Sequence, residues 1–152
     1  LSAAKLADRS GTSTIIANGA VEDILLKLRS GDDIGTLLVA DTEPVAARKQ
    51  WLAGQLVLSG TVKLDSGAVK VLQNDGKSLL AVGIKSVTGQ FARGDVVACL
   101  DKSGEEVARG LVNYDYLEVS KLKGSSSKEI EQLLGYAGEE EIIHRDNLVL
   151  VP

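Results

Sequence analysis

Aromatic residues are scarce in this sequence, at 3% of 152 residues, and methionine is absent. A hydrophobic core therefore has to come from Val, Leu, Ile and Ala. The one cysteine, Cys99, excludes an internal disulfide framework and favours a reducing, cytoplasmic location. No apolar run is long enough to cross a membrane, and the first residues lack the basic and apolar segments of a secretory signal.

A surplus of positive charge is also missing, because the formal net charge is −4. Between Leu58 and Lys123, basic and acidic residues are nearly equal in number. A dedicated nucleic-acid binder carries a basic footprint, so this balance weighs against nucleic acid as the main partner. The sequence opens on a helical pattern without a methionine, which we interpret as the sign of a truncated chain.

The first forty residues follow a helix–strand–helix–strand pattern. A helix is expected over 1–9, and the β-branched run at 12–17 is typical of a buried parallel strand. A second strand is expected over 34–39, and Gly31 is placed to end the helix between the two strands. The apolar face of that helix is formed by Val21, Ile24, Leu25 and Leu28. The pattern predicts a piece of an α/β layered sheet.

The segment 41–55, with Pro44 and Trp51, is the best domain boundary, as a linker or as a short helix. After it, short strands and turn residues at close spacing predict a mostly β unit closed like a barrel. The expected strands are 55–64, 68–72, 78–81, 86–87, 95–100, 106–113 and 147–151, with turns at 65–67, 74–76 and 102–104.

Two helices are expected late in the chain. Residues 116–122 form the first. Ser126 and Glu129 have the spacing of a capping box, which predicts a helix through Ile130 and Leu134 that stops at Gly135.

The stretch from 83 to 97 contains three glycines, Gly83, Gly89 and Gly94. Each permits a positive φ or a close backbone approach, and their spacing fits neither the P-loop nor the dinucleotide-binding fingerprint. Together with residues 79–82, Leu-Leu-Ala-Val, this stretch resembles the core motif of the PUA domain, a small β-barrel-like module of RNA-modifying enzymes.

The resemblance extends, in order and over essentially the whole chain, to the glutamate 5-kinase family. Residues 14–19, Thr-Ile-Ile-Ala-Asn-Gly, and 34–37, Ile-Gly-Thr-Leu, stand where that family has strands at the end of its amino-acid kinase domain. Residues 44–51 resemble its interdomain segment, and 131–136 and 144–147 its closing motifs.

This resemblance implies a fold class and a domain division. We expect an α/β fragment from the end of an amino-acid kinase sheet, followed by a mostly β PUA-type pseudo-barrel with short helices. The kinase piece spans 1–45, a linker spans 46–56, and the PUA domain with its closing helix and strand spans 57–152.

The resemblance also implies an activity for the longer parent. Such a protein transfers the γ-phosphoryl group of ATP to the side-chain carboxylate of L-glutamate, with Mg²⁺, in the first step of proline biosynthesis. It is a cytoplasmic homo-oligomer that proline inhibits.

The family's glycine-rich phosphate loop and its glutamate-binding residues precede the helix with which this sequence opens. We therefore expect no catalytic residue, no bound cofactor and no activity in this chain alone. Asn18 and Gly19 are expected near the nucleotide edge of the sheet, at the end of a strand.

An RNA or ligand surface on the PUA part would use Lys77, Lys85, Arg93 and Arg109, although singly spaced basic residues are more often solvated surface. An RNA-binding PUA module of an RNA-modification or translation-related protein is the alternative function. A self-contained interaction domain is a third.

The two remaining reactive side chains favour structural roles. His144 is the only histidine, and no metal-ligand spacing surrounds it. Cys99 lies in an apolar strand pattern and is expected to be a buried, inert thiol. Phe91, between two glycines, is expected in the core, and Glu139–Glu141 in a solvated turn.

Overall fold

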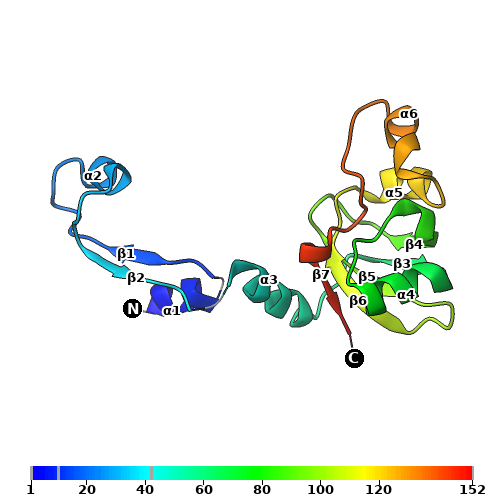
Figure 1. The fold of residues 1–152 in the computed structure, drawn as a ribbon, viewed down its shortest axis with the longest axis horizontal. Coiled ribbons are helices and arrows are strands. Elements are labelled where there is room, and N and C mark those ends of the chain that lie inside the picture. Colours follow the sequence, from blue (N-terminus) through cyan, green and yellow to red (C-terminus); the bar gives the residue numbers. More distant parts are fainter. Residues whose placement is uncertain (1, 10, 42, 152) are drawn as a thin grey trace. The chain divides into compact units, whose positions relative to one another are not determined.

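The computed structural model describes residues 2–9, 11–41 and 43–151, and the chain divides into two compact units at the Arg48–Lys49 junction (Figure 1). Leu1 and Pro152, the ends of the expected domains, lie outside the described residues. No helix within the described ranges has both the length and the apolar character needed to cross a bilayer.

The first unit confirms the expected order of elements. Helix α1 (Ser2–Arg9) is followed by strand β1 (Thr14–Ile16), helix α2 (Ile24–Ser30) and strand β2 (Thr36–Leu38). The expectation of a buried parallel strand at 12–17 was wrong, since β1 pairs antiparallel with β2, and Ile15 and Ile16 are 48% and 46% exposed. A β-branched run favours an extended backbone but does not encode the direction or the cover of its partner.

Helix α2 starts later than its apolar spacing suggests. Asp23 precedes it in the left-handed conformation, with φ of 56°, so Val21 lies in the turn before the helix. Gly31 ends the helix with φ of 89°, as expected. Leu25 is 77% exposed, so the expected apolar face is not fully buried.

The segment between the two parts is helical, which was one of the two alternatives. Helix α3 (Pro44–Ala53) begins at a proline, whose fixed φ suits the first helical turn.

The second unit is built on a five-stranded sheet (Figure 1). Its strands are β3 (Gly60–Leu64), β4 (Ile84–Gly89), β5 (Val96–Leu100), β6 (Glu106–Leu111) and β7 (Leu148–Leu150). They lie in the order β4-β3-β5-β6-β7, with β3 and β5 parallel and the other neighbours antiparallel. The expected α/β piece followed by a mostly β unit is thus confirmed.

The expectation of a strand at 68–72 was wrong. This segment lies in helix α4 (Ser66–Asp75), whose first turn is capped by Asp65, because its carboxylate accepts a hydrogen bond of 2.8 Å from the Ala68 N–H. The supposed turn at 65–67 is therefore a helix start. Gly76, with φ of 56°, ends the same helix.

The strand expected at 78–81 is reduced to a single bridge. Leu79 pairs with Ile143, and a short 3-10 turn, η1 (Ala81–Gly83), then leads into β4.

The late helices follow the expectation. Helix α5 (Tyr116–Leu122) has the expected bounds. A capping box between Ser126 and Glu129 opens η2 (Ser127–Glu129), which continues into α6 (Ile130–Leu134) and stops at Gly135 with φ of 82°. A last turn, η3 (Arg145–Asn147), precedes β7.

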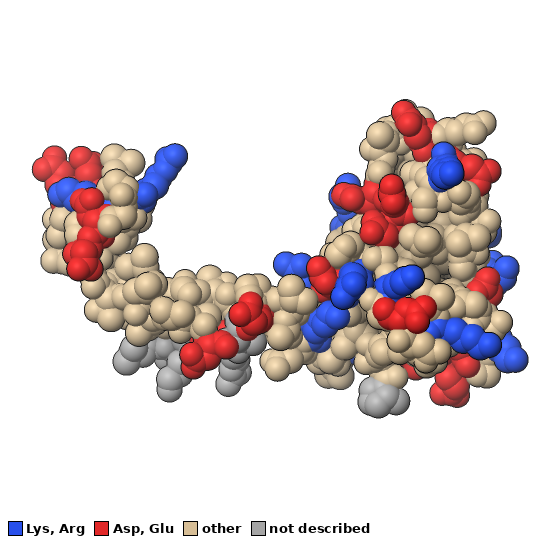
Figure 2. Space-filling view, viewed as in Figure 1, with Lys and Arg blue, Asp and Glu red and all other residues tan. Residues whose placement is uncertain are grey.

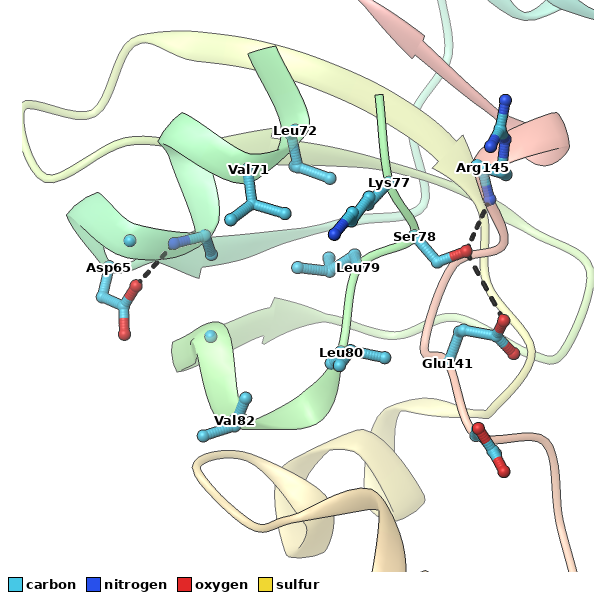
Figure 3. A pocket seen from close by; sticks show the side chains of 14 residues that line it. Asp65, Val71, Leu72, Lys77, Ser78, Leu79, Leu80, Val82, Glu141 and Arg145 are labelled. Carbon is cyan, nitrogen blue, oxygen red and sulfur yellow. Dashed lines mark hydrogen bonds between the residues drawn. The ribbon is translucent and has the colours of Figure 1, made fainter. Parts of the chain in front are cut away.

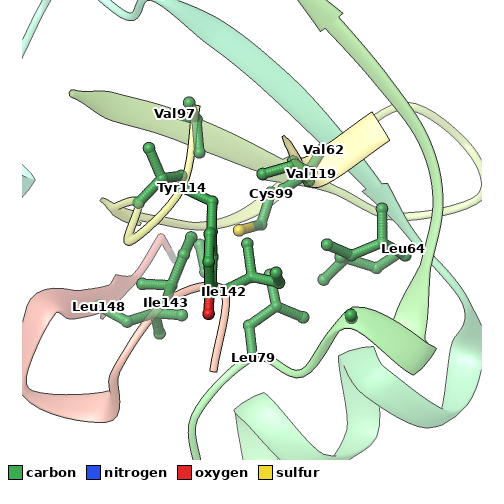
Figure 4. Packing of buried hydrophobic residues seen from close by; sticks show 14 of the residues in the cluster. Val62, Leu64, Leu79, Val97, Cys99, Tyr114, Val119, Ile142, Ile143 and Leu148 are labelled. Carbon is green, nitrogen blue, oxygen red and sulfur yellow. The ribbon is translucent and has the colours of Figure 1, made fainter. Parts of the chain in front are cut away.

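The core of the second unit is mainly aliphatic, as the composition predicts (Figure 4). Val62, Val97, Ile142 and Ile143 are fully buried. Phe91 is 5% exposed, which confirms its place in the core, and its ring meets that of Tyr116 edge-on with centroids 5.9 Å apart.

The three glycines of the central motif have the roles expected of them. Gly89 and Gly94 have φ of 99° and 88°. Gly83 is a close approach, because a Cβ at this position would lie 2.5 Å from the Cβ of Ala68 on α4. The motif therefore brings the turn before β4 directly against the first turn of α4.

We expect Gly83→Ala to lower the free energy of unfolding by about 1–3 kcal/mol, the usual cost of overpacking. The added methyl group would clash with Ala68, so α4 or η1 has to move. Gly54→Ala is the matched control, because its Cβ would meet nothing closer than 3.6 Å. Urea titration followed by circular dichroism measures both, and an unchanged midpoint for Gly83→Ala would contradict the close packing.

Candidate functional site

A hollow lies beside α4 in the second unit (Figure 3). This α4 pocket has a volume of about 530 Å³ and is lined by α4, by the segment from Lys77 to Gly83, and by Glu140, Glu141 and Arg145. Most of its surface is aliphatic, from Val71, Leu72, Leu79, Leu80 and Val82. Its size lies within the range of about 300–1,000 Å³ that small-molecule sites occupy.

Ser78 joins the two walls of the α4 pocket. Its hydroxyl accepts a hydrogen bond of 3.0 Å from the Arg145 N–H and donates one of 3.5 Å to the Glu141 carboxylate. These contacts hold the segment before β4 against the segment before β7, although the two lie more than sixty residues apart in sequence.

The acidic residue at the other end of the pocket is also engaged. The Asp65 carboxylate accepts from the Ala68 N–H and lies 3.6 Å from the Lys85 ammonium. Lys77 lines the same pocket but, within the described ranges, makes no hydrogen bond or ion pair. The pocket therefore offers one uncommitted cation above an aliphatic surface.

The four basic residues expected on a ligand surface do not converge. Lys77 lines the α4 pocket and Lys85 pairs with Asp65 at 3.6 Å, whereas Arg93 pairs with Glu139 at 3.4 Å. In the view of Figure 2, basic and acidic side chains are interspersed over the second unit. This distribution matches the nearly equal numbers of basic and acidic residues between Leu58 and Lys123.

Arg109 has a structural role. Its side chain is only 15% exposed, and its guanidinium donates to both carboxylate oxygens of Glu106, at 2.7 and 3.0 Å. It also donates to the main-chain carbonyls of Ala53 and Gln55. Arg109 thus ties the end of α3 to β6, and its donors face inward.

Asn18 and Gly19 lie in a turn of the first unit. The Asn18 side-chain oxygen accepts from the Ala20 N–H at 3.0 Å, and no atom lies within 4 Å of a Cβ placed on Gly19. Within the described residues, no group of three or more His, Cys, Asp or Glu side chains is placed to hold a metal ion. The Asn18 side-chain oxygen is engaged within its own turn.

Two residues expected to be structural are found in structural positions. His144 caps η3, because its Nδ1 accepts a hydrogen bond of 3.2 Å from the Asp146 N–H. Cys99 is fully buried on β5, and burial, followed by the charge of Glu106, raises the pKa of its thiol to about 12. Neither side chain is placed for nucleophilic or metal chemistry.

Sequence reasoning missed the pocket itself. Its signal is an alternation in the Leu79–Val82 segment, where Leu79 and Ala81 are buried while Leu80 and Val82 are 40% and 53% exposed. Because all four residues are apolar, periodicity could not separate the two sides. The helical state of α4, which supplies Val71 and Leu72, was also missed.

We expect Arg109→Lys to lower the free energy of unfolding by about 1.5–3 kcal/mol, because an ammonium cannot replace the forked contacts to Glu106 and the two carbonyls. Arg93→Lys is the control. Its ion pair with Glu139 is exposed on both sides, so its loss should cost less than about 1 kcal/mol. Thermal unfolding of both variants measures the difference, and equal costs would contradict a special role for Arg109.

The raised pKa of Cys99 gives the free energy of unfolding a pH dependence. In the unfolded chain the thiol ionises around its ordinary pKa of 9.0, whereas the folded thiol holds its proton to about pH 12. The free energy of unfolding should therefore fall as pH rises from 9 towards 12. Urea unfolding across this range should give a shallower slope for Cys99→Val, and parallel slopes would contradict the prediction.

The second unit is similar to known PUA domains. The family model of the PUA domain matches residues 60–134. A solved PUA domain from Aeropyrum pernix K1, determined as a tartrate complex, aligns with a TM-score of 0.42 and 28% identity over 57% of this chain and 42% of that one.

Curated relatives match almost the whole sequence. A glutamate 5-kinase of Teredinibacter turnerae is 58% identical over 148 residues, which are 97% of this chain and 40% of that protein. One of Saccharophagus degradans is 54% identical over 149 residues, 98% of this chain and 40% of that protein. The PUA model thus matches the middle of the second unit, and over nearly its whole length the chain is similar to glutamate 5-kinases, of whose length it spans about 40%.

Proposed function

We propose that this chain is the PUA-bearing part of a glutamate 5-kinase. The whole enzyme transfers the γ-phosphoryl group of ATP, with Mg²⁺, to the side-chain carboxylate of L-glutamate, as the first step of proline biosynthesis. One observation carries the proposal, which is identity above 50% to such kinases over 97–98% of the chain, across both units. A shared PUA domain alone would account for residues 60–134 only.

In this proposal the two units have separate tasks. Residues 1–45 complete the kinase domain, 46–56 join it to the rest, and 57–152 form the PUA domain with its closing helix and strand. The exposed apolar side chains of the β1–β2 ribbon support the first task. Ile15, Ile16 and Leu37 are between 46% and 58% exposed, and a two-stranded ribbon with apolar side chains is stable only when another element covers it.

Catalysis belongs to the rest of the enzyme. Phosphoryl transfer is achieved by positioned donors and metal ions around the phosphates. The described residues supply no metal-binding cluster, and the Asn18 side-chain oxygen accepts a hydrogen bond within its own turn. Asn18 and Gly19 would lie at the nucleotide edge only once the kinase sheet is complete.

The PUA domain serves regulation or assembly of the enzyme. The balanced charge of the second unit supports this role over RNA binding, since Lys85, Arg93 and Arg109 are each paired with a carboxylate. The relatedness also implies a cytoplasmic homo-oligomer inhibited by proline. RNA binding by the PUA domain is the second candidate, and Lys77 is its best-placed cation.

We expect this chain alone to form no γ-glutamyl phosphate from ATP and glutamate, because it lacks the phosphate loop. The chain extended upstream to the length of its relatives should be active. Trapping the product as its hydroxamate measures both, and a kinase domain supplied in trans tests whether the parts reassociate.

Inactivity of both chains would refute the kinase assignment. In that case, retention on structured RNA that falls steeply with salt would support the RNA-binding alternative. Activity of the short chain alone would contradict the assignment of catalysis to the rest of the enzyme.

A further inference from the structure

We propose that the α4 pocket binds a small amphipathic anion, an aliphatic carboxylate whose hydrocarbon part covers Leu80, Val82 and Val71 and whose carboxylate meets Lys77. This inference concerns the second unit alone and is independent of the kinase assignment.

The floor of the pocket is apolar surface that the fold leaves uncovered. Leu72 and Leu79 are each 1% exposed, so they are already used by the core. Val71, Leu80 and Val82 are 37%, 40% and 53% exposed and line the same hollow. Covering such surface contributes roughly 25 cal/mol per Å², so a ligand with a hydrocarbon part gains binding energy here.

The chemistry of the lining favours an aliphatic ligand over a nucleobase. None of the residues that line the α4 pocket is aromatic. Single-stranded nucleic acid is held by stacking on aromatic rings or on Arg planes. The one Arg of the lining, Arg145, lies 3.8 Å from Asp146 and is fixed through its main chain to Ser78.

One cation at the rim, Lys77, is placed to meet an anionic group. Asp65 pairs with Lys85 at 3.6 Å, and the Glu141 carboxylate is held towards Ser78 by a hydrogen bond of 3.5 Å. Within the described residues, the Lys77 ammonium makes no hydrogen bond or ion pair. Figure 3 shows its side chain extending over the pocket between Val71 and Leu79, while the Glu141 side chain points towards Ser78. Glu140 also lines an adjoining hollow, together with Lys128. A carboxylate beside Lys77 would gain a charge-assisted hydrogen bond.

Titration of the isotope-labelled chain with hexanoate, followed by amide chemical shifts, tests the proposal. We expect saturable shifts confined to residues 67–83 and 140–145, and affinity for hexanol about tenfold weaker, because hexanol lacks the charge. Lys77→Gln should weaken hexanoate binding by about the same factor. Val82→Ser, at an exposed position, should weaken hexanoate and hexanol alike.

Lys102→Gln is the matched control, because Lys102 is an exposed lysine in the β5–β6 turn, away from the pocket. It should bind hexanoate as the parent chain does. The proposal is overturned if hexanoate gives no saturable shifts, if hexanol binds equally well, or if Lys77→Gln and Lys102→Gln behave alike. It is also overturned if the pocket residues respond to a single-stranded oligoribonucleotide but not to hexanoate.

Discussion

Close approach of backbone to backbone at glycine is the constraint on which the second unit depends. A Cβ on Gly89 would lie 2.6 Å from the Cα of Gly60, and one on Gly110 would lie 2.6 Å from the Asn147 carbonyl oxygen. With one Phe and one Trp in the whole chain, the core is filled mainly by aliphatic side chains, and dense packing of these requires the surrounding turns to lie close to the sheet. The glycines allow this, and Arg109 then fastens the end of α3 to the same sheet.

Much of this architecture could be predicted from local sequence signals. Strands β5 and β6 follow from apolar runs, and α6 from the spacing of Ser126 and Glu129. The failures occurred where local signals are ambiguous. Asp65 precedes Ser-Gly, a sequence that suits a turn as well as a helix cap, and only its hydrogen bond to Ala68 decides between them. The direction of β1 depends on a partner twenty residues away.

The candidate site was less predictable than the fold. Basic residues can be counted in a sequence, but their partners cannot. The sequence alone therefore predicts Arg109 on a ligand surface, although its guanidinium is bound to Glu106 and to two carbonyls. The pocket depends on tertiary contacts from the start, since Ser78 meets Arg145 and Glu141 across the fold. Lys77 was singled out from sequence, yet its apolar surroundings became visible only with α4 in place.

The last segment of the second unit, residues 142–150, affects how this unit folds while the chain is being synthesised. Ile142 and Ile143 are fully buried, and β7 completes the sheet beside β6. Because β3 pairs in parallel with β5, strands distant in the sequence have to meet before the sheet can form. During synthesis on the ribosome, most of the strands therefore emerge before residues 142–150, which complete the core. Until then the unit exposes an unpaired edge at β6 and apolar surface that chaperones recognise.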